Sequence, residues 1–282
     1  RLSVLSAQID EGKKMTETAG IGHTRWATHG KPSDENSHPH RSASGKFAVV
    51  HNGIIENYAV IKKQLQEEGV EFLSETDTEV VAQLLDKYYT GDFFAAVRSA
   101  VAQLEGSYAL GVLCADFPEE MIAVRNASPL IVGLSDEGNF IASDIPAVLA
   151  HTRRILQLAD HEMVRLTKDS AQVFDAHGMP VNKMETIVNW DVSSAEKGGY
   201  AHFMIKEIME QPQALSATIS PRIDANGSIV LDGVHLTKKD LQQINRVYMV
   251  ACGSAYHTCM VGKYIMEKLA RIPVEADLAS EF

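Results

Sequence analysis

The spacing of apolar residues changes along the chain from a helical to a strand-like pattern, and this order restricts the fold class. Three segments between residues 57 and 106 carry apolar side chains at helical spacing, and Thr76 or Asp77 is a plausible cap of the second. Four short apolar runs follow between residues 107 and 144, separated by turn residues, as in an antiparallel meander. Helices first and hairpin strands later predict an α+β fold whose sheets are covered by helices.

A second change in character begins near residue 190. Residues 193–245 mix Gly, Pro and charged residues around one amphipathic helical pattern, which indicates an interdomain linker. From residue 246, an apolar run, a small-residue loop, a long helical pattern and a second apolar run predict a βαβ unit. Because a parallel sheet is buried on both faces, we expect the rest of this second domain to lie outside the chain. The predicted first domain therefore covers 1–192, and the second begins at 246 and continues to 282.

Composition excludes several classes of function. The 282 residues are 45% hydrophobic and 22% charged, which suffices for a packed core. A net charge of −11 argues against nucleic acid or an anionic membrane as the main partner, and no apolar run is long enough for a membrane span. Cys114, Cys252 and Cys259 form no CxxC pair, so neither a disulfide framework nor a structural zinc site is expected. A cytoplasmic location is the expectation.

The stretch FAVVHNGIIENY, residues 47–58, allows two interpretations. Asn52-Gly53 between apolar runs is a strong hairpin signal, because both residues tolerate the positive φ of a tight turn. However, His51 precedes the pair, and a dense polar string, HTRWATHG, lies some twenty residues upstream. The pair is therefore either a turn or part of a site.

The string HTRWATHG, residues 23–30, also has two interpretations. It is either a solvated strand end whose Trp26 packs inward, or a pocket for a small zwitterion. In the second case Arg25 would hold a carboxylate in a bidentate fork, assisted by Thr28 and His29. The segment SETDTEV, residues 74–80, is a good helix start, but its Asp77 could also face a substrate ammonium group.

A metal site is a rival interpretation of the same region. Five histidines crowd it, namely His23, His29, His38, His40 and His51. Asp77 and Glu79 could complete a ligand set. The spacing of the histidines matches no zinc signature, and Pro32 and Pro39 place two of them in a turn-rich loop.

A small-residue loop, ACGSAYH, occupies residues 251–257 between the predicted strand and helix of the second domain. Backbone N–H groups near Gly253 and Ser254 could approach a phosphate at the helix N-terminus. Equally, tight strand-to-helix turns use small residues for packing alone. Cys252 fits a space-filling role better than that of a nucleophile.

Taken together, the motifs resemble a known family. GIGHTRWATHG, HPH, VVHNGIIENY, SETDTEV, the helical HFMIKEIMEQP and ACGSAYH occur in the order typical of glutamine–fructose-6-phosphate amidotransferases. The resemblance covers nearly the whole chain. It implies a four-layer αββα sandwich of the N-terminal-nucleophile hydrolase type, followed by the start of an α/β sugar isomerase (SIS) domain.

The resemblance also implies roles for single residues. Asn52, through its side-chain amide, and Gly53, through its backbone N–H, would form an oxyanion hole. The implied glutamine-binding residues are Arg25, Thr28 and His29 for the α-carboxylate, Asp77 for the α-ammonium group, and Trp26 at the pocket mouth. Gly253 and Ser254 would bind sugar phosphate, although Ala255 stands where the family commonly has a Ser.

The implied reaction hydrolyses glutamine and passes the ammonia to fructose 6-phosphate, which becomes glucosamine 6-phosphate. No metal or organic cofactor is implied, nor nucleic acid or membrane, and the sugar isomerase domains would pair in a homodimer. The family's nucleophile is an N-terminal Cys, which we expect on an upstream segment, so this chain alone should be inactive. A non-catalytic module that binds glutamine or sugar phosphate and, less favoured, a His-rich metal hydrolase remain as alternatives.

Overall fold

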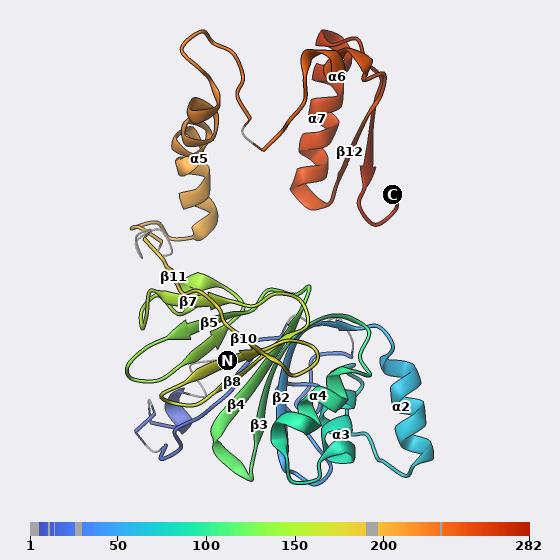
Figure 1. The fold of residues 1–282 in the computed structure, drawn as a ribbon, viewed down its shortest axis with the longest axis vertical. Coiled ribbons are helices and arrows are strands. Elements are labelled where there is room, and N and C mark those ends of the chain that lie inside the picture. The colour runs from blue at the N-terminus through green and yellow to red at the C-terminus, as the bar shows by residue number, and fades with distance from the viewer. Residues whose placement is uncertain (1–5, 11, 14, 26–29, 190–196, 232) are drawn as a thin grey trace. The chain divides into compact units, whose positions relative to one another are not determined.

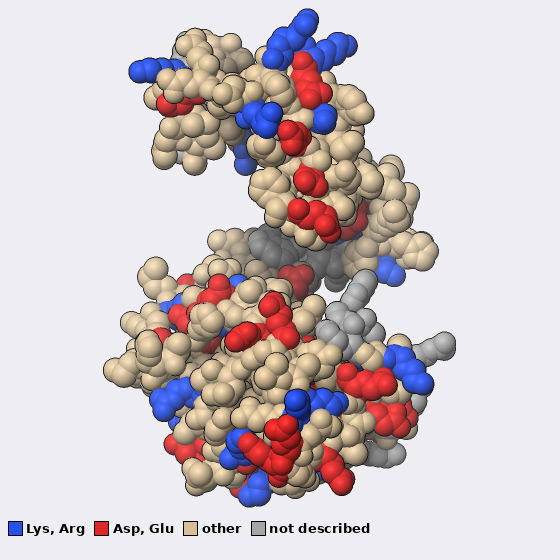
Figure 2. Space-filling view, turned by 90° about the vertical axis from the view of Figure 1, so that its right-hand side faces the viewer, with Lys and Arg blue, Asp and Glu red and all other residues tan. Residues whose placement is uncertain are grey.

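The computed structural model describes residues 6–10, 12–13, 15–25, 30–189, 197–231 and 233–282. The chain divides into two compact units, Arg1–Gly198 and Gly199–Phe282 (Figure 1). No helix in the described part of the chain has both the length and the apolar character that crossing a bilayer requires. On the face seen in Figure 2, the coloured side chains of Lys and Arg are interspersed with those of Asp and Glu.

The first unit is built on a seven-stranded sheet in the order β1-β2-β3-β4-β8-β9-β10, in which all neighbours are antiparallel. Its strands are β1 (His40–Arg41), β2 (Phe47–Ile55), β3 (Gly106–Cys114), β4 (Phe117–Asn126), β8 (Glu162–Leu166), β9 (Ala171–Phe174) and β10 (Pro180–Val181). The interior strand β3 has the run YALGV buried without alternation, because both faces of the sheet are covered.

Three helices cover one face of this sheet. They are α2 (Tyr58–Glu67), α3 (Glu79–Tyr88) and α4 (Phe93–Val101), and they correspond to the three helical patterns in the sequence. The core beneath them includes Phe47, Val80, Phe93 and Leu110, each no more than 1% exposed. Asp92 caps α4, since its carboxylate accepts the N–H of Ala95 at 3.0 Å.

A four-stranded antiparallel sheet packs on the other face, in the order β11-β7-β5-β6. Its strands are β5 (Ile131–Leu134), β6 (Phe140–Ala142), β7 (Arg154–Gln157) and β11 (Thr186–Ile187). Val132 and Leu156 face the first sheet, whereas Ile131 and Ile155 face outward onto Val148 and Leu149, next to the short helix η1 (Ile145–Ala147). The predicted α+β class, with two packed sheets and helical layers outside them, is confirmed.

The second unit contains a parallel pair of strands. Its elements are α5 (Phe203–Ile219), η3 (Ser220–Arg222), α6 (Lys238–Gln243), β12 (Val247–Ala251), α7 (Gly253–Leu269) and β13 (Val274–Leu278). Strands β12 and β13 pair from Val247↔Val274 to Ala251↔Leu278, so the predicted βαβ unit is confirmed. The division between the two units falls between residues 198 and 199 and tests neither predicted boundary, at 192 or at 245. Both boundaries stay predictions.

Candidate functional site

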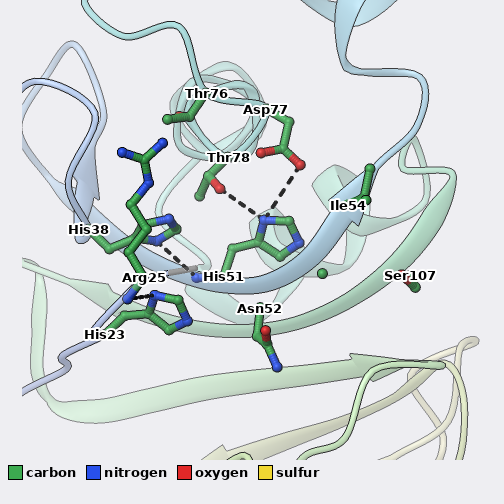
Figure 3. Close-up of a pocket in the computed structure, with 11 residues that line it drawn as sticks. His23, Arg25, His38, His51, Asn52, Ile54, Thr76, Asp77, Thr78 and Ser107 are labelled. Atoms are coloured by element: carbon green, nitrogen blue, oxygen red, sulfur yellow. Dashed lines mark hydrogen bonds and ion pairs between the residues drawn. The ribbon is translucent and has the colours of Figure 1, made fainter. Parts of the chain in front are cut away.

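A cavity of about 270 Å³ opens beside strand β2 and the loop that leads into α3 (Figure 3). Its lining residues come from five separate segments: His23, Arg25, His38, His51, Asn52, Gly53, Ile54, Thr76, Asp77, Thr78 and Ser107. The fold therefore brings Arg25, the Asn52–Gly53 pair and Asp77 together at one place. The other predicted glutamine-binding residues, Trp26, Thr28 and His29, lie outside the described residues.

Asn52 and Gly53 lie inside strand β2. Asn52 pairs with Ala109 and Gly53 with Tyr108, without a register shift, so the hairpin interpretation is wrong. Gly53 has a φ of +129°, and a Cβ at this position would lie 2.1 Å from the carbonyl oxygen of Ser107. Glycine is thus required here by close approach to β3. The glycine of the Asn-Gly pair is therefore explained by a contact between strands and not by a turn.

Asp77 is anchored to the same strand. Its Oδ2 accepts the backbone N–H of Ile55 at 2.8 Å, and its side chain is 5% exposed. The next residue, Thr78, shares a hydrogen bond of 2.9 Å with Nδ1 of His51. Helix α3 consequently begins at Glu79 without a side-chain cap, because these groups bond to β2 instead. The prediction that Thr76 or Asp77 caps the helix is wrong, because Asp77 bonds to β2 and the hydroxyl of Thr76 bonds to His40 and Ser74.

The histidines around the cavity are held neutral by burial. Desolvation lowers the pKa of His38 to about 3, helped by the neighbouring His40 and His23, and lowers that of His51 to about 4. The rings of His23 and His38 lie 4.7 Å apart, and those of His38 and His40 lie 4.9 Å apart. At neutral pH the charged side chains among the lining residues are therefore one cation and one anion, Arg25 and Asp77.

Comparison with known proteins gives this arrangement a family. Residues 9–207 match the glutamine amidotransferase domain, and residues 240–282 match the SIS domain. The chain belongs to the glutamine amidotransferase domain family. The resemblance drawn from the motifs is thereby confirmed.

Two similar relatives of the chain are both called glutamine–fructose-6-phosphate aminotransferase [isomerizing]. The one from Caldanaerobacter subterraneus subsp. tengcongensis is 57% identical over 282 residues, all of this chain and 46% of the relative. The one from Clostridium tetani is 54% identical over the same length, again 46% of the relative. The chain thus spans about half the length of these relatives.

Two solved structures are also similar in part. A glutamine phosphoribosylpyrophosphate amidotransferase from B. subtilis is 20% identical, with a TM-score of 0.49, over 90% of this chain and 50% of that one. The C-terminal domain of glucosamine-fructose-6-phosphate aminotransferase from Francisella tularensis is 42% identical, with a TM-score of 0.27, over 30% of this chain and 24% of that one.

Arg25 of the amidotransferase domain has a φ of +58°, and its guanidinium Nη2 donates to the carbonyl of Gly30 at 2.9 Å. Asn36, which sequence reasoning missed, joins this segment to the loop that carries Asp77. Its amide donates to the carbonyl of Lys31 at 3.0 Å, and its Oδ1 accepts the N–H of Glu75 at 2.8 Å. An Asn in a polar loop carries no signal for such a role, since its second partner lies 39 positions away.

His51 and Thr78 are a second pair that the sequence did not single out together. They stand 27 positions apart, and only the pairing of β2 with its neighbours and the packing of α3 bring them into contact. Ser107, on β3 opposite Ile54, also lines the cavity, and nothing in the sequence singled it out.

The metal interpretation gains no support from the described residues. No group of three or more His, Cys, Asp or Glu side chains in the described part of the chain is placed to hold an ion. Glu79 instead accepts the N–H groups of Leu73 and Ser74 at 2.9 and 2.6 Å, and His40 bonds to Thr76 at 3.0 Å. These side chains shape the loop that presents Asp77.

The predicted sugar-phosphate residues lie in the second unit, at the start of α7. Gly253 is the first residue of this helix and has a φ of +59°, and both Gly253 and Ser254 are exposed. Cys252 stands at the N-cap, where its side chain makes no capping hydrogen bond. Their role in binding stays a prediction.

Proposed function

We propose that the cavity binds glutamine, and that the protein to which this chain belongs transfers the amide nitrogen of glutamine to fructose 6-phosphate, yielding glucosamine 6-phosphate. The observation that carries the proposal is that Arg25 and Asp77 line the same small cavity, together with Gly53. Family membership and the names of the closely similar relatives support the same reaction.

In this proposal the two charged groups recognise the amino-acid end of glutamine. The guanidinium of Arg25, with Thr28 and His29, takes the α-carboxylate, because a planar fork of donors matches two carboxylate oxygens. Asp77 takes the α-ammonium group, and Trp26 closes the mouth of the pocket. Neutral histidines support this assignment, since an imidazolium in the cavity would compete with the ligand's ammonium group for Asp77.

The amide of Asn52 and the backbone N–H of Gly53 would stabilise the oxyanion that develops on the glutamine carboxamide. Losing one such donor typically costs about 10²–10³ in rate. The left-handed φ of Gly53 supports the role, because it allows a peptide orientation that a side chain would prevent. In Figure 3 the side chain of Asn52 points to the face of β2 opposite that of His51.

The cysteines of this chain do not fit the part of the nucleophile. Cys114 is buried in β3, and burial raises the pKa of its thiol, which disfavours the reactive thiolate. Cys252 and Cys259 belong to the second unit. We therefore keep the inference that an N-terminal Cys of the whole protein attacks the carboxamide, and that this chain alone does not hydrolyse glutamine.

For the second unit we propose sugar-phosphate binding at Gly253 and Ser254, next to the N-terminus of α7. The match to the SIS domain supports this, although Ala255 removes one hydroxyl donor from the loop. Association into a homodimer through these domains and a cytoplasmic location complete the proposal.

The test uses the full-length gene product. Glutamate release is measured with and without fructose 6-phosphate, and glucosamine 6-phosphate is quantified in the same samples. We expect stoichiometric formation of the two products. Glutamine binding without any glutamate release would favour a non-catalytic glutamine-binding module, and inhibition by a chelator would revive the metal hydrolase.

A further inference from the structure

His51 is a buried titratable group to which the proposed reaction assigns no role. Its side chain is 2% exposed, and it lies in β2 directly before Asn52. A buried imidazole is costly unless it is hydrogen-bonded, so its contacts indicate what it does.

The imidazole faces the loop that carries Asp77. Its Nδ1 shares a 2.9 Å hydrogen bond with the hydroxyl of Thr78 and lies 3.8 Å from Oδ2 of Asp77 (Figure 3). Nε2 makes no hydrogen bond within the described residues. A proton on Nε2 would leave Nδ1 as the acceptor of the Thr78 hydroxyl.

Two consecutive residues of the loop are thus bonded to one strand. Asp77 accepts from the N–H of Ile55, and Thr78 bonds to the ring of His51, four positions earlier in β2. One bond would leave the loop free to pivot about it, whereas two fix the direction in which the Asp77 carboxylate faces. The strand itself is held at this point, because the N–H of His51 donates to Nδ1 of His38 at 3.3 Å.

We propose that His51 is a positioning residue, which ties the loop before α3 to β2 through Thr78 and so sets Asp77 relative to Asn52 and Gly53. The inference rests on the proposed function, in which Asp77 binds the ammonium group of glutamine. His51 acts through Thr78 and does not itself contact the ligand. Its loss should therefore weaken the binding of glutamine more than it slows the chemical step.

The experiment compares two substitutions of His51 in the full-length protein. His51→Leu removes both ring nitrogens, whereas His51→Asn places an amide near the position of Nδ1 and can still bond to Thr78. We expect His51→Leu to raise the KM and the Kd for glutamine about threefold to tenfold, the usual effect of losing one neutral hydrogen bond, with kcat nearly unchanged. His51→Asn should restore most of the affinity.

A double-mutant cycle tests the route through Thr78. Thr78→Val preserves the shape of the side chain and should raise the KM as His51→Leu does, while the combined variant should be no worse than either alone. Thr152→Val is the matched control for Thr78→Val: it removes the hydrogen bond from a threonine hydroxyl to the carbonyl of Leu134 in the second sheet, where neither residue lines the cavity, and should leave the KM unchanged. If His51→Leu does not fold, Thr78→Val and Thr78→Ser carry the test.

A wild-type KM and Kd in His51→Leu, or strictly additive effects of His51→Leu and Thr78→Val, would overturn the inference. Equal losses of affinity in Thr78→Val and Thr152→Val would overturn it too, since they would show a general loss of stability. Calorimetric Kd values test the role of His51 separately from the proposed function. If the wild-type protein binds glutamine without releasing glutamate, the proposed transferase fails, and the Kd values of the variants still decide the role of His51. Absence of glutamine binding would overturn both.

Discussion

The backbone N–H of Ile55 donates a 2.8 Å hydrogen bond to the carboxylate of Asp77, across 22 positions of sequence. The bond joins the end of strand β2 to the loop before α3, and it is buried. A carboxylate in such a place is stable only when its oxygens are bonded. The bond therefore fixes the carboxylate of Asp77 beside the cavity, where the proposed function places the ammonium group of the ligand.

The first prediction separates these two properties of Asp77. Asp77→Asn keeps an oxygen that can accept from Ile55 but removes the charge, so the fold should persist while the Kd for glutamine rises about ten- to a hundredfold. Isothermal titration calorimetry on the full-length protein measures the change. As a control, 4-carbamoylbutanoate, which lacks the amino group, should bind the variant and the wild type alike. An unchanged Kd for glutamine would remove Asp77 from the proposed site.

A second prediction concerns the close contact at Gly53. Gly53→Ala should lower the free energy of unfolding by roughly 2 kcal/mol more than Gly138→Ala does, measured by urea denaturation. Gly138 is a matched control, because its φ of +145° is similar but nothing lies within 4 Å of its added Cβ, whereas Gly53 would meet the Ser107 carbonyl. Equal losses in the two variants would mean that backbone strain alone explains the glycine.

A third prediction follows from the neutral histidines. In the unfolded chain each imidazole takes up a proton near pH 6.5, but folded His38 and His51 stay neutral down to pH values of about 3 and 4, because burial lowers their pKa. The unfolded state binds more protons below pH 6.5, so stability is complete above that pH and falls as the pH drops toward 4. Each such proton contributes at most about 1.4 kcal/mol per pH unit.

Urea midpoints at pH 8, 7, 6 and 5 measure this loss of stability. The double variant His38→Asn, His51→Asn should show a flatter dependence, whereas His177→Asn, a change at an exposed histidine, should keep the wild-type slope. A midpoint that does not change between pH 8 and 5 in the wild type would contradict the burial argument.

A fourth prediction addresses Asn36, which is 3% exposed and bonds to Lys31 and Glu75. Asn36→Ala leaves part-buried backbone groups without these partners, so the free energy of unfolding should fall by about 1–3 kcal/mol. The Kd for glutamine should rise as well, because Asn36 connects the segment of Arg25 to the loop of Asp77. Asn139→Ala is the control: it removes a side-chain amide that donates to the carbonyl of Thr167, and neither residue lines the cavity. This variant should lower the stability without changing the Kd. A stable variant with normal affinity would show that the bridge is dispensable.

Much of the fold could be predicted from the sequence because its signals are local. The helical spacing over 57–106 and the short apolar runs after it correspond to α2, α3, α4 and to the strands that follow. The βαβ pattern after residue 246 was equally clear. What failed was the detail at ends and breaks: Asn-Gly was ambiguous as a turn, and Asp77 looked like a cap.

The sequence by itself determined the class of fold, the family and the residue types that carry charge into the cavity, since periodicity and motif order are properties of the chain alone. The tertiary structure decided that Gly53 serves a contact between strands, and that His51, Thr78 and Asn36 hold Asp77 in place. The physical reason is that hydrogen bonds between residues 22 to 39 positions apart exist only once β2, β3 and α3 have packed and excluded water from the groups between them.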